Sequence, residues 1–584
     1  MNESGRSSAG FPFAPGSASS LVSLKNERLK RSRMAPVRRL HALLSSPDAA
    51  IKVARMPVQD IALLIAQVGL ADAVELVGLA TPDQIQRVVD IDVWDRDEID
   101  IRRYGEWLEV LLSAKGEDAV KSLRGMDPEP LLYYFRRYIR IHLAEDEERS
   151  EAEKLRLEAL DLVKSPDDLF LIEFVDQDEP LRDFILATLQ RLYTLDLEFS
   201  RWLMMSLHAV LPTVILEAAY RIRTGRVEEL GFLEREDALS VYQPLRADQY
   251  EKPFPSVHED LTHSVPLPVP SSLIRGAPGT LLSRALEISA ARRETDAVER
   301  GIMHLTNKVL AAEQVPFRQW ERIVDTMRRV RGILDIGLAL EAGDDPRRAA
   351  SLLEDVHPEW IFRRGFTPIA LLARRASALV EAMRRKVGGR LPVAAEPPYD
   401  EVLVALTMNP PHCALQIVSP AEGGVEPFSS LEQVRRCEEV LAEIEHALRF
   451  ILDDLAWHPV SIEKLEAALA FQKRALSAEG ILMTCVARSL LDGDMRLDPL
   501  NEEELARLIQ SAFEGGAAPG MLRAMKPEVE ARVLASAPDD DEGLHAFVRR
   551  GLDAFRDAYG ALPAHPLDDL RMAGGPVYLL PSQS

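Results

Sequence analysis

The sequence predicts an all-α protein of stacked helix pairs, in a superhelical or solenoid-like arrangement interrupted by proline-rich crossings. Three observations predict this class. A helix-start signal recurs in the first third of the chain, apolar residues recur at steps of three and four further on, and no long alternating apolar and polar run is rich in β-branched residues. Helices are therefore expected to form almost the whole fold.

The helix-start signal combines a capping side chain, a proline at the first helical position and an acid in the first turn. It occurs four times, at Ser46-Pro47-Asp48, Thr81-Pro82-Asp83, Asp127-Pro128-Glu129 and Ser165-Pro166-Asp167. The four prolines are 35, 46 and 38 residues apart. This uneven spacing favours successive helix pairs over a repeat of fixed length.

The C-terminal part shows the same helical pattern. A buried stripe is predicted from residue 431, at Val434, Cys437, Leu441, Ile444, Leu448 and Ile451. Ser429 and Glu432 predict a capping box before it, with Phe428 as the hydrophobic staple. A second box, Asn501 to Glu504, precedes an apolar face made of Leu505, Leu508, Ile509, Ala512 and Phe513.

Two stretches rich in proline or glycine break the helical pattern and predict boundaries. The second stretch leaves room for one short helix around residues 401–406. The predicted organisation is a flexible basic tail at 1–39, a helical superhelix at 40–250, a proline-rich linker or crossing at 251–280, a middle helical region at 281–386, a Pro/Gly-rich connection at 387–427, a C-terminal helical region at 428–560 and a tail at 561–584.

Composition indicates a folded, acidic protein. Of 584 residues 47% are apolar, and 70 basic against 93 acidic residues give a net charge of −23. Such a surface repels phosphate, so nucleic acid is an unexpected partner apart from transient contact by the basic N-terminal tail. Cys413, Cys437 and Cys485 are too few for a disulfide framework, so a reducing, cytoplasmic compartment is expected.

Neither a signal peptide nor a membrane span is predicted. The apolar run at 40–44 is too short for a secretion signal. The best candidate span, Trp202 to Leu216, contains His208 and Pro212 and falls short of the roughly 20 apolar residues a span requires. We interpret it as a core helix.

Histidine patterns suggest metal sites but lack the required spacing. His258 and His263 lie five residues apart, whereas zinc-protease histidines lie four apart on one helical face. The Glu-x-x-His pairing of di-iron bundles occurs at Glu354/His357, Glu443/His446 and Glu542/His545. Because the second pair lies off the apolar stripe, we interpret these residues as solvated or capping.

Other chemical motifs are incomplete or missing. Asp95, Asp97 and Glu106 match positions one, three and twelve of a calcium loop, but Asp100 stands where glycine is required, which leaves only weak cation binding open. Phosphate loops, dinucleotide fingerprints, nucleophile elbows and C-x-x-C pairs do not occur. His412-Cys413 has no identifiable orienting partner. No catalytic, cofactor-binding or metal residue and no cofactor is therefore predicted.

Three blocks of sequence carry a resemblance to a known family. They are LVGLATPDQIQRVVDIDVWDRDEID at 76–100, GFLEREDALSVYQPL at 231–245 and LLDGDMRLDPLNEEELARLI at 490–509. The chain resembles a bacterial family of helical proteins of unknown function, which implies one family-wide architecture and no activity. Its N-terminal helix pairs also resemble the superhelical N domain of MgtE magnesium transporters and their FliG-like relatives. Transport does not follow, because the sequence shows no membrane half.

Two classes of function fit these observations. Stacked helix pairs expose long faces that bind other proteins, which favours a cytoplasmic scaffold or regulatory protein-interaction protein whose partner is unknown. The alternative is an all-α enzyme, with or without a metal, whose site is assembled from residues distant in sequence. Trp94 and Trp107 are expected in the core, although surface anchors for a partner are the other reading.

Overall fold

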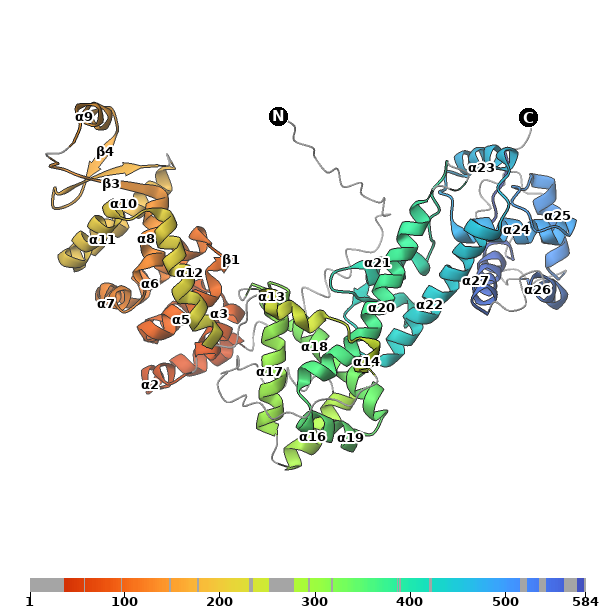
Figure 1. Ribbon diagram of the computed structural model, residues 1–584, viewed down its shortest axis with the longest axis horizontal. Coiled ribbons are helices and arrows are strands. Elements are labelled where there is room, and N and C mark those ends of the chain that lie inside the picture. The colour runs from red at the N-terminus through yellow and green to blue at the C-terminus, as the bar shows by residue number, and fades with distance from the viewer. Residues whose placement is uncertain are drawn as a thin grey trace. The chain divides into compact units, whose positions relative to one another are not determined.

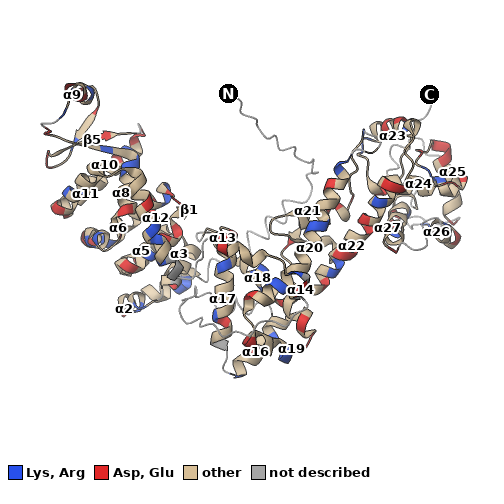
Figure 2. Cartoon of the chain, in the orientation of Figure 1, with Lys and Arg blue, Asp and Glu red and all other residues tan. Residues whose placement is uncertain are grey.

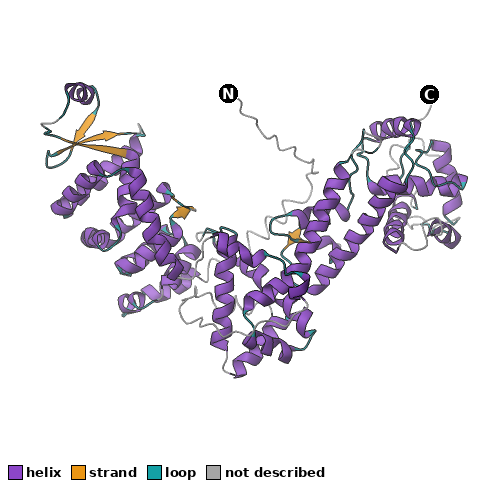
Figure 3. Ribbon diagram, viewed as in Figure 1, coloured by secondary structure: helices purple, strands orange, loops and turns teal. Residues whose placement is uncertain are grey.

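The computed structural model describes residues 36–581 except 57, 96, 147–148, 176–177, 230–234, 251–277, 293–294, 317–318, 386, 388–389, 420–422, 515–522, 535–541 and 561–574. Most described residues are helical, as predicted (Figure 3). They form two compact units, each described by itself: an N-terminal unit that runs to Val241 and includes Asp296–Met327, and a C-terminal unit made of the other described residues. Most of the predicted crossing at 251–280 lies outside the described residues.

The N-terminal unit is a stack of short helices (Figure 1). Its helices are α2 (Ala49–Ala54), α3 (Val58–Val68), α4 (Val74–Leu79), α5 (Pro82–Asp92), α6 (Ile101–Lys115), α7 (Ala119–Arg124), α8 (Pro128–Tyr138), α9 (Glu151–Glu158), α10 (Glu179–Leu195), α11 (Leu197–Ala209), α12 (Pro212–Glu229) and α13 (Arg235–Ala238), with most of α17 (Thr295–Ala312). Short 3-10 turns are η1 (Ala71–Ala73), η2 (Gly116–Asp118) and η3 (Leu239–Tyr242). Helix α12 packs lengthwise along α8 and α5.

The four helix-start signals have four different outcomes. Thr81 forms a complete capping box with Gln84, and Pro82 opens α5, as predicted. Asp127 is the N-cap of α8, but its side chain makes no capping hydrogen bond. Ser46 precedes α2 by one turn, and Asp48 occupies the cap position without a side-chain bond. Only the signal at Thr81 is confirmed in full.

The helix start predicted from the fourth signal was wrong, because Ser165-Pro166-Asp167 forms a hairpin turn. It joins β4 (Leu162–Lys164) to β5 (Phe170–Phe174). The Ser165 hydroxyl accepts from the Phe170 backbone N–H at 3.0 Å and donates to Asp167 at 2.7 Å. Serine and aspartate stabilise such turns as readily as they cap helices.

A small antiparallel sheet lies beside α11 and has the order β3-β5-β4. Strand β3 (Ile139–Leu143) pairs with β5 in the register Ile139 to Phe174. Its buried Ile139 and Ile141 alternate with outward residues, which is the pattern of a half-buried strand. A second pair, β1 (Trp94–Asp95) and β2 (Glu98–Ile99), is a short hairpin. The sequence did not predict these strands, although the all-α class holds for most of the chain.

The C-terminal unit contains longer helices. They are α14 (Ala247–Tyr250), α16 (Leu281–Arg292), α19 (Pro346–Asp355), α20 (Pro358–Arg384), α21 (Tyr399–Thr407), α22 (Leu431–Arg449), α23 (Pro459–Gln472), α24 (Ala478–Asp492), α25 (Glu502–Ala512), α26 (Pro527–Leu534) and α27 (Glu542–Tyr559), with most of α18 (Trp320–Ala342). Strands β6 (Cys413–Ala414) and β7 (Val425–Glu426) pair, η5 (Leu415–Ile417) is a 3-10 turn, and η6 (Phe450–Asp454) is a π-helical turn that extends α22.

Two glycines let α18 and α20 pack closely. A Cβ on Gly337 would lie 2.1 Å from the Ile361 carbonyl oxygen, and one on Gly365 would lie 2.1 Å from the Ile333 carbonyl oxygen. Any larger residue would push the two backbones apart. Helix α20 then continues alongside α21 and α22, and α22 packs against α27.

Most C-terminal helix predictions are confirmed. The short helix expected around residues 401–406 is α21. The Asn501–Glu504 capping box opens α25. The α22 stripe is buried from Val434 to Leu448, and Phe428 is 1% exposed. The predicted cap was one residue early, because Ser430 rather than Ser429 accepts from a backbone N–H, that of Gln433.

Candidate functional site

A buried group of polar side chains joins α21, α22 and α27 in the C-terminal unit. The Tyr399 hydroxyl donates to the Glu443 carboxylate at 2.8 Å, and Arg550 donates to both oxygens of the same carboxylate at 2.6 and 3.1 Å. Glu443 is 7% exposed. Burial and the Glu443 charge raise the pKa of Tyr399, so this phenol stays a hydrogen-bond donor. The hydrogen bonds of Glu443 raise the pKa of Arg550.

A second polar group lies at the start of α24. The Glu396 carboxylate accepts from Arg474 at 2.8 Å and from the Ser477 hydroxyl at 2.6 Å. Ser477 is also the N-cap of α24, where its hydroxyl accepts from the Gly480 backbone N–H at 3.1 Å. The Tyr578 hydroxyl accepts from the Ser477 backbone N–H at 2.7 Å. The C-terminal segment thereby fixes the first turn of α24.

Glu479 stands in that first turn and is 9% exposed. Its carboxyl group is hydrogen-bonded to that of Glu396, and no ion pair joins it to any cation of the described chain. Burial and the neighbouring Glu396 charge raise the pKa of Glu479 to about 7. A carboxyl group with such a pKa can hold or release a proton near neutral pH.

Glu479 lines a pocket of about 230 Å³ between the start of α21, the start of α24 and the middle of α27. Its other walls are Pro397, Pro398, Tyr399, Phe547, Arg550, Gly551, Asp553 and Ala554. The rings of Tyr399 and Phe547 stack with centroids 4.8 Å apart. The pocket therefore combines a buried carboxyl group of raised pKa, Glu479, with an aromatic wall. We call it the Glu479 pocket.

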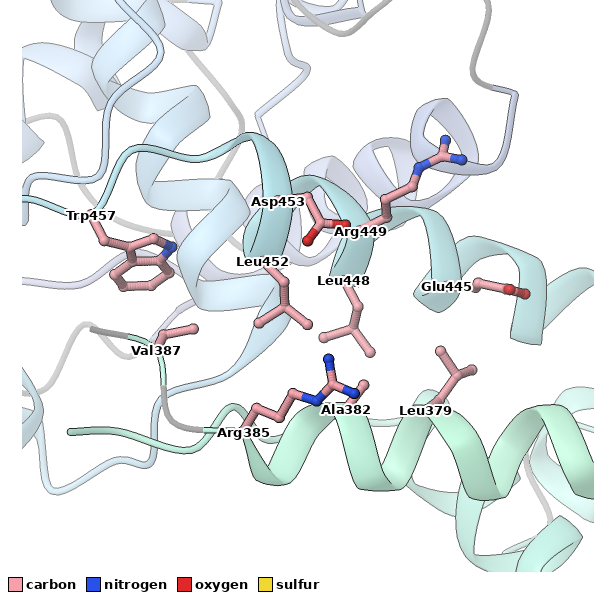
Figure 4. A pocket seen from close by; sticks show the side chains of 10 residues that line it. All are labelled: Leu379, Ala382, Arg385, Val387, Glu445, Leu448, Arg449, Leu452, Asp453 and Trp457. Atoms are coloured by element: carbon pink, nitrogen blue, oxygen red, sulfur yellow. The ribbon is translucent and has the colours of Figure 1, made fainter. Parts of the chain in front are cut away.

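A larger cleft of about 440 Å³ lies where α20 ends beside α22 and the π-helical turn (Figure 4). Leu448 and Leu452 point from one side toward α20, Arg385 extends into the space, and Arg449 points away from it. Trp457 closes one end. π-Helical turns are frequent at functional sites. The cleft rim carries both signs of charge, so it favours no single ligand charge.

The end of the N-terminal unit exposes apolar side chains. Among the described residues, ten of the nineteen exposed large apolar side chains lie between Leu155 and Ile222. Four of them form what we call the α11–α12 surface: Trp202, Met205, Leu211 and Val214, which are 42%, 46%, 64% and 54% exposed. Elsewhere acidic and basic residues are interspersed over the helices of both units (Figure 2).

The interpretation of residues 202–216 as one core helix was wrong. Helix α11 ends at Ala209, α12 begins at Pro212, and the two axes bend by 115°. Proline cannot continue the α11 hydrogen bonding, which explains the break. No single described helix has the length and apolar composition to cross a membrane, although the bent pair passes this test jointly.

The Glu-x-x-His pairs have separate structural contacts. His357 caps α20, since its Nδ1 accepts from the Glu359 backbone N–H at 3.2 Å, which confirms the capping interpretation. Glu354 accepts from Ser289 at 2.9 Å and Arg292 at 2.8 Å. Glu542 opens α27, which also carries His545.

For Glu443 the solvated interpretation was wrong. The carboxylate is buried because α27 covers that side of α22 and supplies Arg550. His446 is half-buried, with its Nδ1 3.2 Å from Arg449. Among the described residues, no three His, Cys, Asp or Glu side chains converge as metal ligands.

The residues of the candidate calcium loop and the two tryptophans do not form a common site. Asp95 is in β1, whereas Glu106 is on α6 and pairs with Arg103, so they share no loop. Trp107 is in the core, as expected, and donates to Asp92 at 2.7 Å. Trp94 is half-buried under Arg223.

Two further candidates concern histidine and cysteine. His258 and His263 lie outside the described residues. All three cysteines are buried free thiols, and Cys437 is in the core as expected.

Sequence reasoning missed the Glu479 pocket. The signal that exists is local, since Ser477 predicts a cap with an acid in the first turn, and that pattern indicates an exposed carboxylate. Nothing in the sequence predicts that the segments around residues 396, 474, 550 and 578 cover it. The pocket is a product of tertiary packing.

Comparison with known proteins identifies a family and no activity. The model of the Family of unknown function (DUF6178) matches residues 16–575, nearly the whole chain. No curated protein and no solved structure matches the chain. The resemblance to MgtE and FliG-like proteins thus finds no support in these comparisons.

Proposed function

Because the chain belongs to the family of unknown function DUF6178, whose description assigns no activity, we propose from the structure that it is a helical interaction protein. Its partner is another protein, docked on the α11–α12 surface. The observation that supports this proposal is the exposure of Trp202, Met205, Leu211 and Val214 at one end of the helical stack. Trp202 and Met205 lie one turn apart on α11, and Leu211 and Val214 lie one turn apart where α12 begins. Patches of exposed apolar side chains on soluble proteins mark interaction sites.

The residue types fit a protein partner. Tryptophan and methionine are enriched in protein interfaces, and a few such anchors supply most of the binding energy. Trp202 stacks on Phe199 at 5.6 Å, which orients the indole without burying it. Arg201, beside it, is held by Asp167 at 2.9 Å. The proposed anchor therefore rests on a fixed support.

The proposal includes a cytoplasmic location. Its support is that all three cysteines are free thiols, as expected in a reducing compartment. The net charge of −23 favours a partner that offers a basic rim around an apolar centre.

The test is affinity capture of the full-length protein from its native cells, with mass spectrometry of the eluate. The variant W202E/M205E is compared with the control L371E/V404E, which changes two side chains that are 51% and 57% exposed in the C-terminal unit. A stoichiometric partner should be captured by the wild type and the control. Loss of two interface anchors should weaken binding of that partner by at least about tenfold.

Two results would contradict the proposal. One is a partner captured equally by W202E/M205E and the wild type. The other is binding of the wild type, lost in W202E/M205E, to phospholipid vesicles with no protein partner, which would assign the surface to a membrane. Sedimentation of the purified protein shows whether the partner is a second copy of this chain.

The second candidate function is an all-α enzyme, with or without a metal. One observation favours it: Glu479 has a pKa of about 7 in a pocket that also contains Tyr399, as general acid–base catalysis requires. Metal analysis of the purified protein and of H357A and H446A tests the metal-dependent version. Stoichiometric metal lost in either variant would support it, and metal retained at full stoichiometry by both variants would contradict a site at those histidines.

A further inference from the structure

The two polar groups beside the Glu479 pocket contain one more acid than base. Three carboxyl groups, Glu396, Glu443 and Glu479, adjoin two guanidinium groups. Arg474 pairs with Glu396 and Arg550 with Glu443. The excess carboxyl group is that of Glu479, which faces the pocket.

A buried carboxylate without a cation is energetically costly. Glu479 is 9% exposed, and its neighbour Glu396 carries charge of the same sign. Two species can remove the cost: a proton shared by the two carboxyl groups, or a cation that enters the pocket. The pocket supplies space for the second.

The walls favour an organic cation. Phe547 and Tyr399 present stacked rings, Pro397 and Pro398 add apolar surface, and cations bind favourably over aromatic faces. A divalent metal would need several converging oxygen, nitrogen or sulfur ligands, and the described residues supply no group of three. A volume of about 230 Å³ is below the ~300 Å³ typical of the smallest drug-sized ligand sites.

We propose that the Glu479 pocket binds a small organic cation, an ammonium or guanidinium group on a short alkyl chain. The Glu479 carboxylate is its counter-ion, and the Phe547 and Tyr399 rings contact its alkyl part. Arg550 and the Tyr399 hydroxyl are occupied by Glu443 and hold the wall in place. Asp553 also lines the pocket, but Arg556 pairs with it at 2.8 Å and offsets its negative charge. This inference is independent of docking at the α11–α12 surface.

Binding of the cation is coupled to proton release. Below pH 7 the carboxyl group retains its proton, which the cation must displace. The groups that face it are Glu396 and Tyr399 from the loop and start of α21, Arg474 before α24, and Arg550 and Asp553 on α27. For one proton displaced from a group with a pKa of about 7, affinity should rise about tenfold from pH 6 to pH 8.

The test is isothermal titration calorimetry of the full-length protein with n-butylammonium and n-butylguanidinium. n-Butanol is the neutral analogue. Because a charge-assisted hydrogen bond is lost, n-butanol should bind at least about tenfold more weakly. The variant E479Q should lose binding of the cations to a similar extent. The control E463Q, which changes an exposed glutamate on α23, should leave binding unchanged.

Each outcome decides the proposal. No saturable binding of either cation at pH 8 across the millimolar range would overturn it. So would equal affinity for n-butanol, or cation binding that E479Q retains. If E479Q fails to fold by circular dichroism, the pH dependence and the n-butanol comparison in the wild-type protein still decide. Failure here would leave partner capture by the α11–α12 surface unaffected.

Discussion

The two units each bury a cluster of arginine and carboxylate side chains, and the clusters differ in charge balance. In the N-terminal unit, Arg226 donates to Asp90 at 2.6 and 3.1 Å and also pairs with Asp127 at 2.5 Å. Arg223 donates to the Asp90 backbone carbonyl at 2.8 Å. Two acids thus meet two bases. Although burial acts to lower it, the hydrogen bonds and charges of both aspartates raise the pKa of Arg226 overall.

The C-terminal cluster has three acids and two bases, and the excess acid lines a pocket. The N-terminal cluster is enclosed between helices: α5 supplies Asp90, α12 supplies Arg226, and Asp127 directly precedes α8. The same residue types therefore hold helices together in one unit, and in the other they leave a carboxyl group without a cationic partner beside a pocket. Charge balance and an adjoining cavity, rather than burial alone, separate a structural cluster from a candidate site.

The largest expected effect comes from breaking the balanced cluster. In R226M, the carboxyl group of Asp90, which is 1% exposed, loses its main partner. Removing one partner of a buried ion pair costs about 3–5 kcal/mol of the free energy of unfolding. Hydrogen exchange of peptides from α5 and α12 during urea denaturation measures this loss of stability in the N-terminal unit alone.

The matched control is R221M, five residues earlier on α12. Arg221 is 79% exposed on its side chain and pairs with Glu217 on the same helix. Exposed pairs of this kind contribute about 0.3–0.5 kcal/mol. Equal destabilisation by R226M and R221M would show that the Asp90 cluster does not hold α12 in place.

Local patterns predicted the helices of both units, and neither cluster could be predicted from them. Thr81-Pro82 and Ser165-Pro166 are near-identical signals, yet the second became a turn because Ile139 and Ile141 pair with a strand that follows it. That pairing is a long-range contact. Glu443 lies off the apolar stripe of α22, and its burial depends on α27, about one hundred residues later. The periodicity of apolar residues predicts which face of a helix is buried, whereas tertiary packing decides which other helix covers that face.

The second largest effect is a pH dependence of stability that is confined to the C-terminal unit. The pKa of Glu479 is raised from 4.5 to about 7 in the folded protein. The folded state therefore binds more protons between these values, and stability falls as pH rises from about 4.5 to about 7. The loss is on the order of 3 kcal/mol. E479Q removes the carboxyl group and with it this pH-dependent loss of stability, so the variant should be more stable than the wild type at pH 8.

Hydrogen exchange of peptides from α24 at pH 5 and pH 8 measures this difference, after correction for the intrinsic exchange rate. The control E463Q should keep the wild-type dependence. If wild type and E479Q lose stability in parallel between these pH values, Glu479 is not the excess acid, and the contrast between the two clusters disappears.

The smallest expected effect is the loss of stability when either capping box is removed, and there is one such box in each unit. Thr81→Ala and Asn501→Ala each remove a side-chain acceptor at a helix start and should each cost about 1 kcal/mol. The second box also depends on charge. Its Glu504 accepts from Arg488 at 2.8 and 3.0 Å; burial acts to raise the pKa of Glu504, but the Arg488 hydrogen bonds lower it overall.

The stability contributed by Glu504 is therefore present above its unfolded pKa of 4.5 and is lost as pH falls below it. Gln84, its counterpart in the first box, is neutral and donates to the Val53 and Met56 carbonyls at 2.9 and 2.8 Å. Acidification to about pH 3.5 should thus increase exchange at the start of α25 and leave the start of α5 unchanged. Equal protection of both helix starts across this range would mean that charge contributes nothing to the α25 cap.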